Sequence, residues 1–144
     1  MTKVSELIRT KGHQVHGIQK DTPLSGAARA FMEKQVSSFL VYDGDKLVGI
    51  FTKNDLIRCC SLHRPELGDP PVSATMTTDL FAVPSSADLE DVFTETMRRG
   101  LHHVPVVDGD KAVGMLTPID ILIHQKSAAS FENQELLRYI SGSY

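Results

Sequence analysis

Cysteine is scarce in this chain, and its two copies, Cys59 and Cys60, are adjacent. Neighbouring cysteines rarely close a disulfide with each other, and there is no second pair to complete a zinc site. The sequence therefore predicts no disulfide framework and no metal site, and it fits a reducing compartment, the cytoplasm. Two small apolar residues near the end of a helix are the favoured interpretation of the pair, with a redox role as the alternative.

An excess of charge of one sign is also missing, as is any long apolar run. The 144 residues carry 15 lysines and arginines against 18 aspartates and glutamates, a formal net charge of −3. This balance gives no global attraction to nucleic acid. No segment is long enough to span a membrane, and the first residues lack the apolar run of a signal peptide. With 41% hydrophobic and 23% charged residues, we expect one ordinary globular domain or two closely packed half-domains.

What the chain does have is one unit written twice. Residues 43–55 return as residues 108–120, an offset of 108 − 43 = 65. The match runs without a gap from residue 14 to residue 56 of the first copy. Two half-size units of this kind must bury their apolar faces against each other, and the cleft between them has two equivalent corners.

The segments upstream of the two copies match at a different offset. Residues 4–8 resemble residues 72–76 at an offset of 72 − 4 = 68, so repeat 1 carries three extra residues near 10–13. The predicted division of the chain is a first repeat, a turn-rich linker, a second repeat and a helical tail, at residues 1–64, 65–71, 72–126 and 127–144. The tail has an apolar side, which we expect to pack against its own core or a second subunit.

Each repeat gives the same coarse pattern of elements. A short extended piece leads to an amphipathic helix, whose apolar residues recur at spacings of three and four. An apolar strand, an Asp-Gly-Asp turn and a second strand then form a hairpin, and a second helix starts after Thr52 or Thr117. The apolar helix positions are Leu24, Ala27, Ala28, Phe31 and Met32 in the first copy and Leu89, Val92, Phe93 and Met97 in the second. The sequence thus predicts an α/β (α+β) fold of two β-α-β-β-α repeats, with strands at 15–18, 39–42 and 47–51 and at 80–83, 104–107 and 112–116.

The second strand of each hairpin ends in a Gly-x-x-Thr-x-x-Asp pattern, with Thr52 and Asp55 in one copy and Thr117 and Asp120 in the other. Both pairs are typical of a helix N-cap with an acid at the third position, and Pro118 suits the first helical position. The same junction offers free backbone N–H groups to a phosphate, and an aspartate one turn in can accept two hydrogen bonds from a ribose. Capping and nucleotide binding are compatible interpretations.

These patterns resemble a known family. The doubled Gly-x-x-Thr-x-x-Asp motif, the Val-Ser-x-x-Met of residues 72–76 and the His-His-Val-Pro-Val-Val-Asp of residues 102–108 are similar to the cystathionine-β-synthase (CBS) domain pair, or Bateman module. The likeness covers residues 4 to about 124, and the chain looks most like the stand-alone bacterial CBS-pair proteins. This resemblance implies two repeats related by a pseudo-twofold axis, with their sheets packed together and helices outside, and two chains joined in a homodimer.

The resemblance also implies a set of nucleotide-binding residues. The threonine would contact phosphate, the aspartate would hold the ribose hydroxyls, and the adenine would lie against apolar residues of the partner repeat. One site would use Met115, Thr117 and Asp120 with His16, Val36, Ser37, Ser38 and Leu40. The other would use Ile50, Thr52 and Asp55 with Phe81, Leu101, His102, His103 and Pro105.

The two sites differ at one pair of positions: Ser37 and Ser38 in the first repeat correspond to His102 and His103 in the second. As adjacent strand residues, the histidines are expected to point to opposite faces, which disfavours a shared metal. One histidine is either a phosphate contact or an ordinary half-buried residue. The difference predicts unequal phosphate preference or affinity.

The predicted function is a non-catalytic regulatory module. It would bind an adenine nucleotide (AMP, ADP, ATP or NAD(H)) and pass its occupancy to a separate partner protein. An enzyme is disfavoured because no acid, base and nucleophile stand at a recognisable spacing. The alternative is a structural or dimerisation module whose motifs serve only as helix caps.

Overall fold

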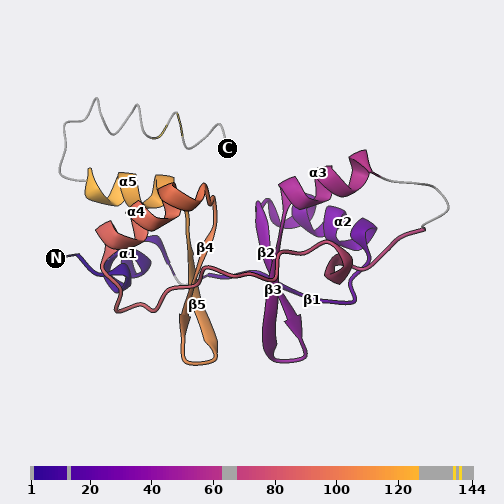
Figure 1. The fold of residues 1–144 in the computed structure, drawn as a ribbon, viewed down its shortest axis with the longest axis horizontal. Helices are drawn as coiled ribbons and strands as arrows, with labels where there is room; N and C mark the ends of the chain where they lie inside the picture. Colours follow the sequence, from indigo (N-terminus) through magenta and orange to yellow (C-terminus); the bar gives the residue numbers. More distant parts are fainter. Residues whose placement is uncertain (1, 13, 63–67, 127–137, 139, 141–144) are drawn as a thin grey trace. The chain divides into compact units, whose positions relative to one another are not determined.

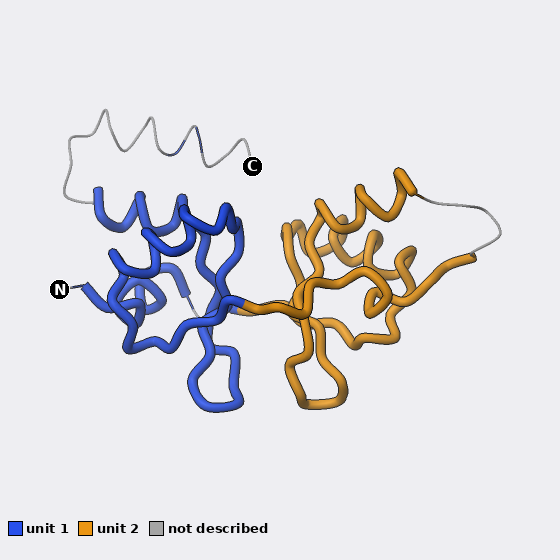
Figure 2. The backbone as a smooth tube through the Cα atoms, in the orientation of Figure 1, with its two compact units in different colours: residues 1–14, 81–144 blue, residues 15–80 orange. Residues whose placement is uncertain are grey.

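A computed structural model describes residues 2–12, 14–62, 68–126, 138 and 140. The predicted helical tail lies almost entirely outside these residues. The described part of the chain contains no helix long and apolar enough to cross a membrane. It forms two compact units, one of residues 1–14 with 81–144 (unit 1) and one of residues 15–80 (unit 2), shown in Figure 2. The boundaries of the units therefore differ from those of the sequence repeats. Residues 1–14 open the first repeat but belong to unit 1, with the helices and hairpin of the second repeat.

Unit 2 has the predicted order of elements. Strand β1 (Gly17–Gln19) lies parallel to β2 (Ser38–Asp43), and β2 pairs antiparallel with β3 (Lys46–Thr52). Helices α2 (Leu24–Lys34) and α3 (Lys53–Ser61) contact each other beside this sheet (Figure 1). Gly44 makes the hairpin turn with a φ of 62°, a left-handed conformation that glycine adopts without steric cost. The core is aromatic, with the rings of Phe31 and Phe39 4.7 Å apart.

Unit 1 repeats the hairpin and both helices. Strands β4 (Val104–Asp108) and β5 (Lys111–Leu116) pair antiparallel, and α4 (Leu89–Arg99) contacts α5 (Pro118–Gln125). Each hairpin carries a register irregularity at the matching place, after Val41 and after Val106. The predicted α+β fold, with its hairpins and following helices, is confirmed.

The strand predicted at residues 80–83 is reduced to a single bridge between Val83 and Val106. In unit 2 the amide of Leu40 donates to the carbonyl of His16, but the matching residue in unit 1 is Pro105, which has no N–H to donate. The ladder is cut at its other end as well, because the amide of Ser85 donates to the Asp108 side chain at 2.9 Å. The parallel pairing therefore stops after one residue pair.

The segments upstream of the repeats begin in equivalent ways and end differently. Val4 starts helix α1 (Val4–Lys11) and its amide donates to the carbonyl of Ala87 in unit 1, while Val72 starts a 3₁₀ turn, η2 (Val72–Ala74), and donates to Thr22 in unit 2. Both valines are fully buried. Each segment thus packs on the unit that carries the other repeat's helices, which explains the different boundaries of repeats and units.

The apolar helix faces are narrower than the sequence suggests. Ala27, Phe31, Leu89 and Val92 are buried as expected, but Met32 and Met97, at matching positions, are 80% and 57% exposed. Ile57 in the middle of α3 and Leu62 just after this helix are also exposed. Helices of both units therefore carry solvent-exposed apolar side chains.

Candidate functional site

The first Gly-x-x-Thr-x-x-Asp motif forms the junction between β3 and α3. Thr52 is the N-cap of α3, and its hydroxyl accepts the amide N–H of Asp55 at 3.2 Å. The Asp55 carboxylate returns the bond, because its Oδ2 accepts the Thr52 amide at 2.9 Å and the Thr52 hydroxyl at 3.1 Å. The predicted cap is therefore confirmed as a reciprocal capping box.

The second motif forms the same box between β5 and α5. The Thr117 hydroxyl accepts the amide of Asp120 at 3.1 Å, Asp120 Oδ2 accepts the amide of Thr117 at 2.9 Å, and Pro118 occupies the first helical position. The two boxes use the backbone amides of the motif threonine and the motif aspartate. The Lys53 amide donates to the Ser37 carbonyl and Pro118 has no N–H, so among the described residues one first-turn amide remains at each junction, that of Asn54 or Ile119. The helix dipole favours an anion there.

The two aspartates differ in exposure and in their cationic partner. Asp55 is buried, with its side chain 4% exposed, and its Oδ1 accepts from the Arg58 guanidinium at 3.1 Å. The Asp120 side chain is 23% exposed and its Oδ2 pairs with the Lys11 ammonium at 2.6 Å. Neither cation was singled out by the sequence, because Arg58 lies outside the motif and Lys11 is more than a hundred residues from Asp120.

Several residues of the predicted nucleotide set meet the first motif within unit 2. Ser38 pairs with Thr52 and Leu40 with Ile50 across the β2–β3 ladder, and the carbonyl of Ser37 accepts the amide of Lys53 at 3.1 Å. Leu40 and Ile50 are buried, whereas Val36 and His16 are partly exposed.

One of the matching residues lies in the hairpin that leads to the second motif in unit 1. Pro105 pairs with Met115 in the β4–β5 ladder. Leu101, His102 and His103 precede β4 and do not lie in it, because the strand begins at Val104; the expectation that the histidines are adjacent strand residues is therefore wrong. His102 is exposed and His103 is partly buried. The structure thus groups each Thr/Asp pair with strand residues of its own unit, and the combinations across repeats stay predictions.

Phe81, a predicted adenine contact, has a cationic neighbour that the sequence did not reveal. The Arg99 guanidinium lies 4.6 Å from the centre of the Phe81 ring, a cation–π geometry. Arg99 also pairs with Glu95 at 2.5 Å, and hydrogen bonds from Arg98 and then Arg99 lower the pKa of Glu95 to about 2. Glu95, Arg98 and Arg99 all belong to α4, the helix that follows Phe81 in the chain. This helix therefore holds the Arg99 guanidinium over the Phe81 ring.

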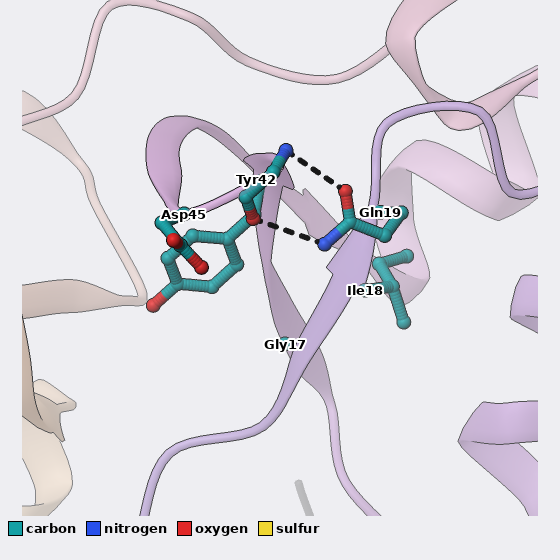
Figure 3. A pocket seen from close by; sticks show the side chains of 6 residues that line it. Gly17, Ile18, Gln19, Tyr42 and Asp45 are labelled. Carbon is teal, nitrogen blue, oxygen red and sulfur yellow. Dashed lines mark hydrogen bonds between the residues drawn. The ribbon is translucent and has the colours of Figure 1, made fainter.

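A hollow of about 370 Å³ lies elsewhere, at the hairpin of unit 2. Figure 3 shows its lining, in which the Gln19 side chain bonds to both main-chain groups of Gly44 at 3.0 and 3.1 Å. Burial raises the pKa of Tyr42 on the same wall. A Cβ at Gly17 would stand 2.7 Å from the Tyr42 ring, so any larger residue there would have to displace the ring. None of the six lining residues belongs to the predicted nucleotide set.

Comparison with known proteins decides the family. The model of the CBS domain matches residues 4–61 and residues 72–127. The chain belongs to the CBS-domain family. It is a tandem CBS pair, and the resemblance read from its motifs is confirmed.

Relatives of the CBS pair include short and long proteins. The CBS domain-containing protein YhcV of Bacillus subtilis is 26% identical over 131 residues, which cover 90% of each chain. Inosine-5'-monophosphate dehydrogenase of Thermoplasma acidophilum is 29% identical over 113 residues, which cover 78% of this chain but only 22% of the dehydrogenase.

Solved structures share the fold. The CBS domain of NE2398 is 30% identical, with a TM-score of 0.79 over 90% of this chain and 98% of that one. CBSX2, solved in complex with AMP, is 23% identical with a TM-score of 0.74 over 90% of this chain and all of that one. The CBS pair of MJ0100, solved with 5'-methylthioadenosine and S-adenosyl-L-methionine, is 20% identical with a TM-score of 0.72 over 89% of this chain and 98% of that one.

Proposed function

We propose that this CBS pair is a non-catalytic regulatory module that binds an adenine nucleotide (AMP, ADP, ATP or NAD(H)) through its Thr52/Asp55 and Thr117/Asp120 junctions. The observation that carries the proposal is the duplicated strand–helix junction, in which a threonine, an aspartate and the amide of the second helical residue meet at one place. Such a junction suits a phosphate, and a carboxylate suits a ribose diol. Two solved relatives of the same fold hold adenosine compounds, which supports an adenosine ligand for this chain.

The proposed mechanism is a shift of population and involves no covalent step. A nucleotide that contacts both repeats would favour one arrangement of the two, and a separate partner protein would distinguish that arrangement. In this proposal the adenine lies against the residues predicted for each cleft, and the protein acts in the cytoplasm.

The test of this function is ligand-dependent stability. Thermal unfolding is measured with AMP, ADP, ATP and NAD at millimolar concentration, and we expect at least one to raise the melting temperature by mass action. The variants Asp55→Asn and Asp120→Asn should each abolish binding at one site while the amide oxygen still accepts the cap bond. Mass spectrometry of nucleotides released from purified protein identifies the ligand. A melting temperature unmoved by every adenosine compound would refute the proposal.

The alternative, a dimerisation module with no nucleotide, is supported by two observations. Both capping boxes close between the threonine and the aspartate themselves, so helix capping alone accounts for the motif residues. Met32 on α2, Ile57 on α3 and Leu62 just after α3 expose apolar side chains, which a second copy of the chain would cover. We propose a homodimer through these helices, and Ile57→Lys should lower the molar mass measured by light scattering to that of a monomer. The same variant with unchanged nucleotide binding would separate the two functions.

A further inference from the structure

One main-chain carbonyl is satisfied differently in the two units. In unit 2 the carbonyl of Ile50 accepts the amide of Thr77 at 2.9 Å, an ordinary backbone bridge. In unit 1 the matching carbonyl, that of Met115, accepts the Lys11 ammonium at 2.5 Å. Lys11 ends helix α1, within the stretch where repeat 1 carries its extra residues. The insertion therefore replaces a neutral N–H with a positive charge at the end of β5.

The same ammonium reaches the motif aspartate. Lys11 Nζ lies 2.6 Å from Asp120 Oδ2, which also accepts the amide of Thr117. A lysine ammonium has three N–H donors, and two of them are used by Met115 and Asp120. Within the described residues, Asp120 Oδ1 accepts no hydrogen bond. The Lys11 and Asp120 side chains are 36% and 23% exposed, so a donor and an acceptor stand side by side within reach of a ligand.

Unit 2 does not offer the same pair. There the second oxygen of Asp55 is taken by Arg58, and the carboxylate is almost fully buried. Asp55 Oδ1 already accepts from Arg58, and the Asp55 side chain is 4% exposed against 23% for that of Asp120, so it is less accessible to a ribose. The two junctions thus differ in the polar groups that they offer to a ligand, in addition to the residues of the neighbouring strands.

We propose that Lys11 is a ribose-reading residue of the Thr117/Asp120 site, an assignment that rests on the proposed function. A ribose hydroxyl is both a donor and an acceptor. It can donate to Asp120 Oδ1 and accept from the third N–H of Lys11, whereas a deoxyribose carbon can do neither. The lysine–aspartate pair therefore selects ribonucleotides over deoxynucleotides at this site. A purely structural role, in which Lys11 only ties α1 to α5, predicts no such selectivity.

The experiment is calorimetric titration of the full chain with AMP, 2'-deoxy-AMP and 3'-deoxy-AMP. The variants are Lys11→Met, Lys11→Arg and Asp120→Asn, the last to mark the site. The matched control is Lys20→Met, because the Lys20 side chain is 39% exposed and pairs with Asp43 at 3.2 Å, away from either motif.

We expect Lys11→Met to weaken AMP about tenfold at the site that Asp120→Asn abolishes, the effect of one charge-assisted hydrogen bond. The same variant should bring the affinities for AMP and its deoxy analogues closer by a similar factor. Lys11→Arg should restore part of both effects, and Lys20→Met should change neither. Lys11→Gln, which keeps a donor for Met115, replaces the methionine variant if that one does not fold.

Two failures are distinguishable. Binding of AMP that needs Asp120 but shows the same affinity and the same discrimination in Lys11→Met would overturn the assignment of Lys11 alone. Absence of any AMP, ADP, ATP or NAD binding to the unmodified chain would overturn the proposed function, and the assignment with it.

Discussion

Replacing Asp55 by alanine separates the structural role of the motif from its proposed binding role, because the capping box acts without any ligand. The change removes three hydrogen bonds: two that Thr52 donates to Oδ2 and one that Arg58 donates to Oδ1. The Arg58 bond adds little, since that side chain is largely exposed. The amide of Thr52 matters more, because it is part-buried and loses its only side-chain acceptor.

The expected cost follows from these contacts. Asp55→Ala leaves the part-buried Thr52 amide without its carboxylate acceptor, and such an unpaired donor costs about 1–3 kcal/mol. We therefore expect Asp55→Ala to lower the free energy of unfolding by roughly 2 kcal/mol. For a chain of this size, about 3 °C of melting temperature corresponds to each kcal/mol, so the shift is roughly 6 °C.

The assay is thermal and urea unfolding of nucleotide-free protein, followed by circular dichroism. Asp55→Asn should lose less than half as much stability, because its amide oxygen can still accept the Thr52 amide. Asp45→Ala, in the exposed hairpin turn, is the control and should match the unmodified chain. If Asp55→Ala melts within about 1 °C of that control, the capping box does not hold the start of α3 and the reasoning is refuted.

Three further predictions concern close contacts and one carboxylate. Gly49→Ala should destabilise by about 2 kcal/mol in urea unfolding, because its Cβ would stand 2.9 Å from the Thr77 carbonyl, which is main chain and cannot turn away. Gly114→Ala would place a Cβ in steric overlap with Ile8 Cδ1; adding Ile8→Val, which removes that methyl, should recover part of the lost stability, and additive costs would contradict this. Hydrogen bonds from the Ser85 hydroxyl and amide lower the pKa of Asp108, so Ser85→Ala, which removes the hydroxyl, should raise that pKa toward its ordinary value in an NMR titration. Because the pKa is lowered in the folded state, this bond stabilises the protein above the unfolded-state pKa, and the contribution is lost as the pH falls through the folded value; an unchanged Asp108 titration would contradict it.

The local elements were predictable because each depends on residues close together in sequence. The hairpins follow from apolar strands joined by Asp-Gly-Asp, and the helix starts follow from Thr-x-x-Asp. The strand predicted at residues 80–83 is reduced to a single bridge because of Pro105. This proline lies in β4, a different element from the strand that it shortens. Met32 and Met97 fit the helical period but lie outside the cores. The spacing of apolar residues identifies the face of a helix that is buried, but it does not tell how wide the buried face is.

The sequence by itself determined that this chain is a duplicated α+β unit with a threonine and an aspartate at both strand–helix junctions, because capping and turn formation are short-range effects. Only the tertiary structure decided which cation meets each aspartate. Arg58 reaches Asp55 along one helix, whereas Lys11 reaches Asp120 because α1 packs on the unit that contains α5. That pairing depends on a three-residue insertion and on the exchange of upstream segments between repeats, and contacts between residues so far apart in sequence are set by packing of the whole unit.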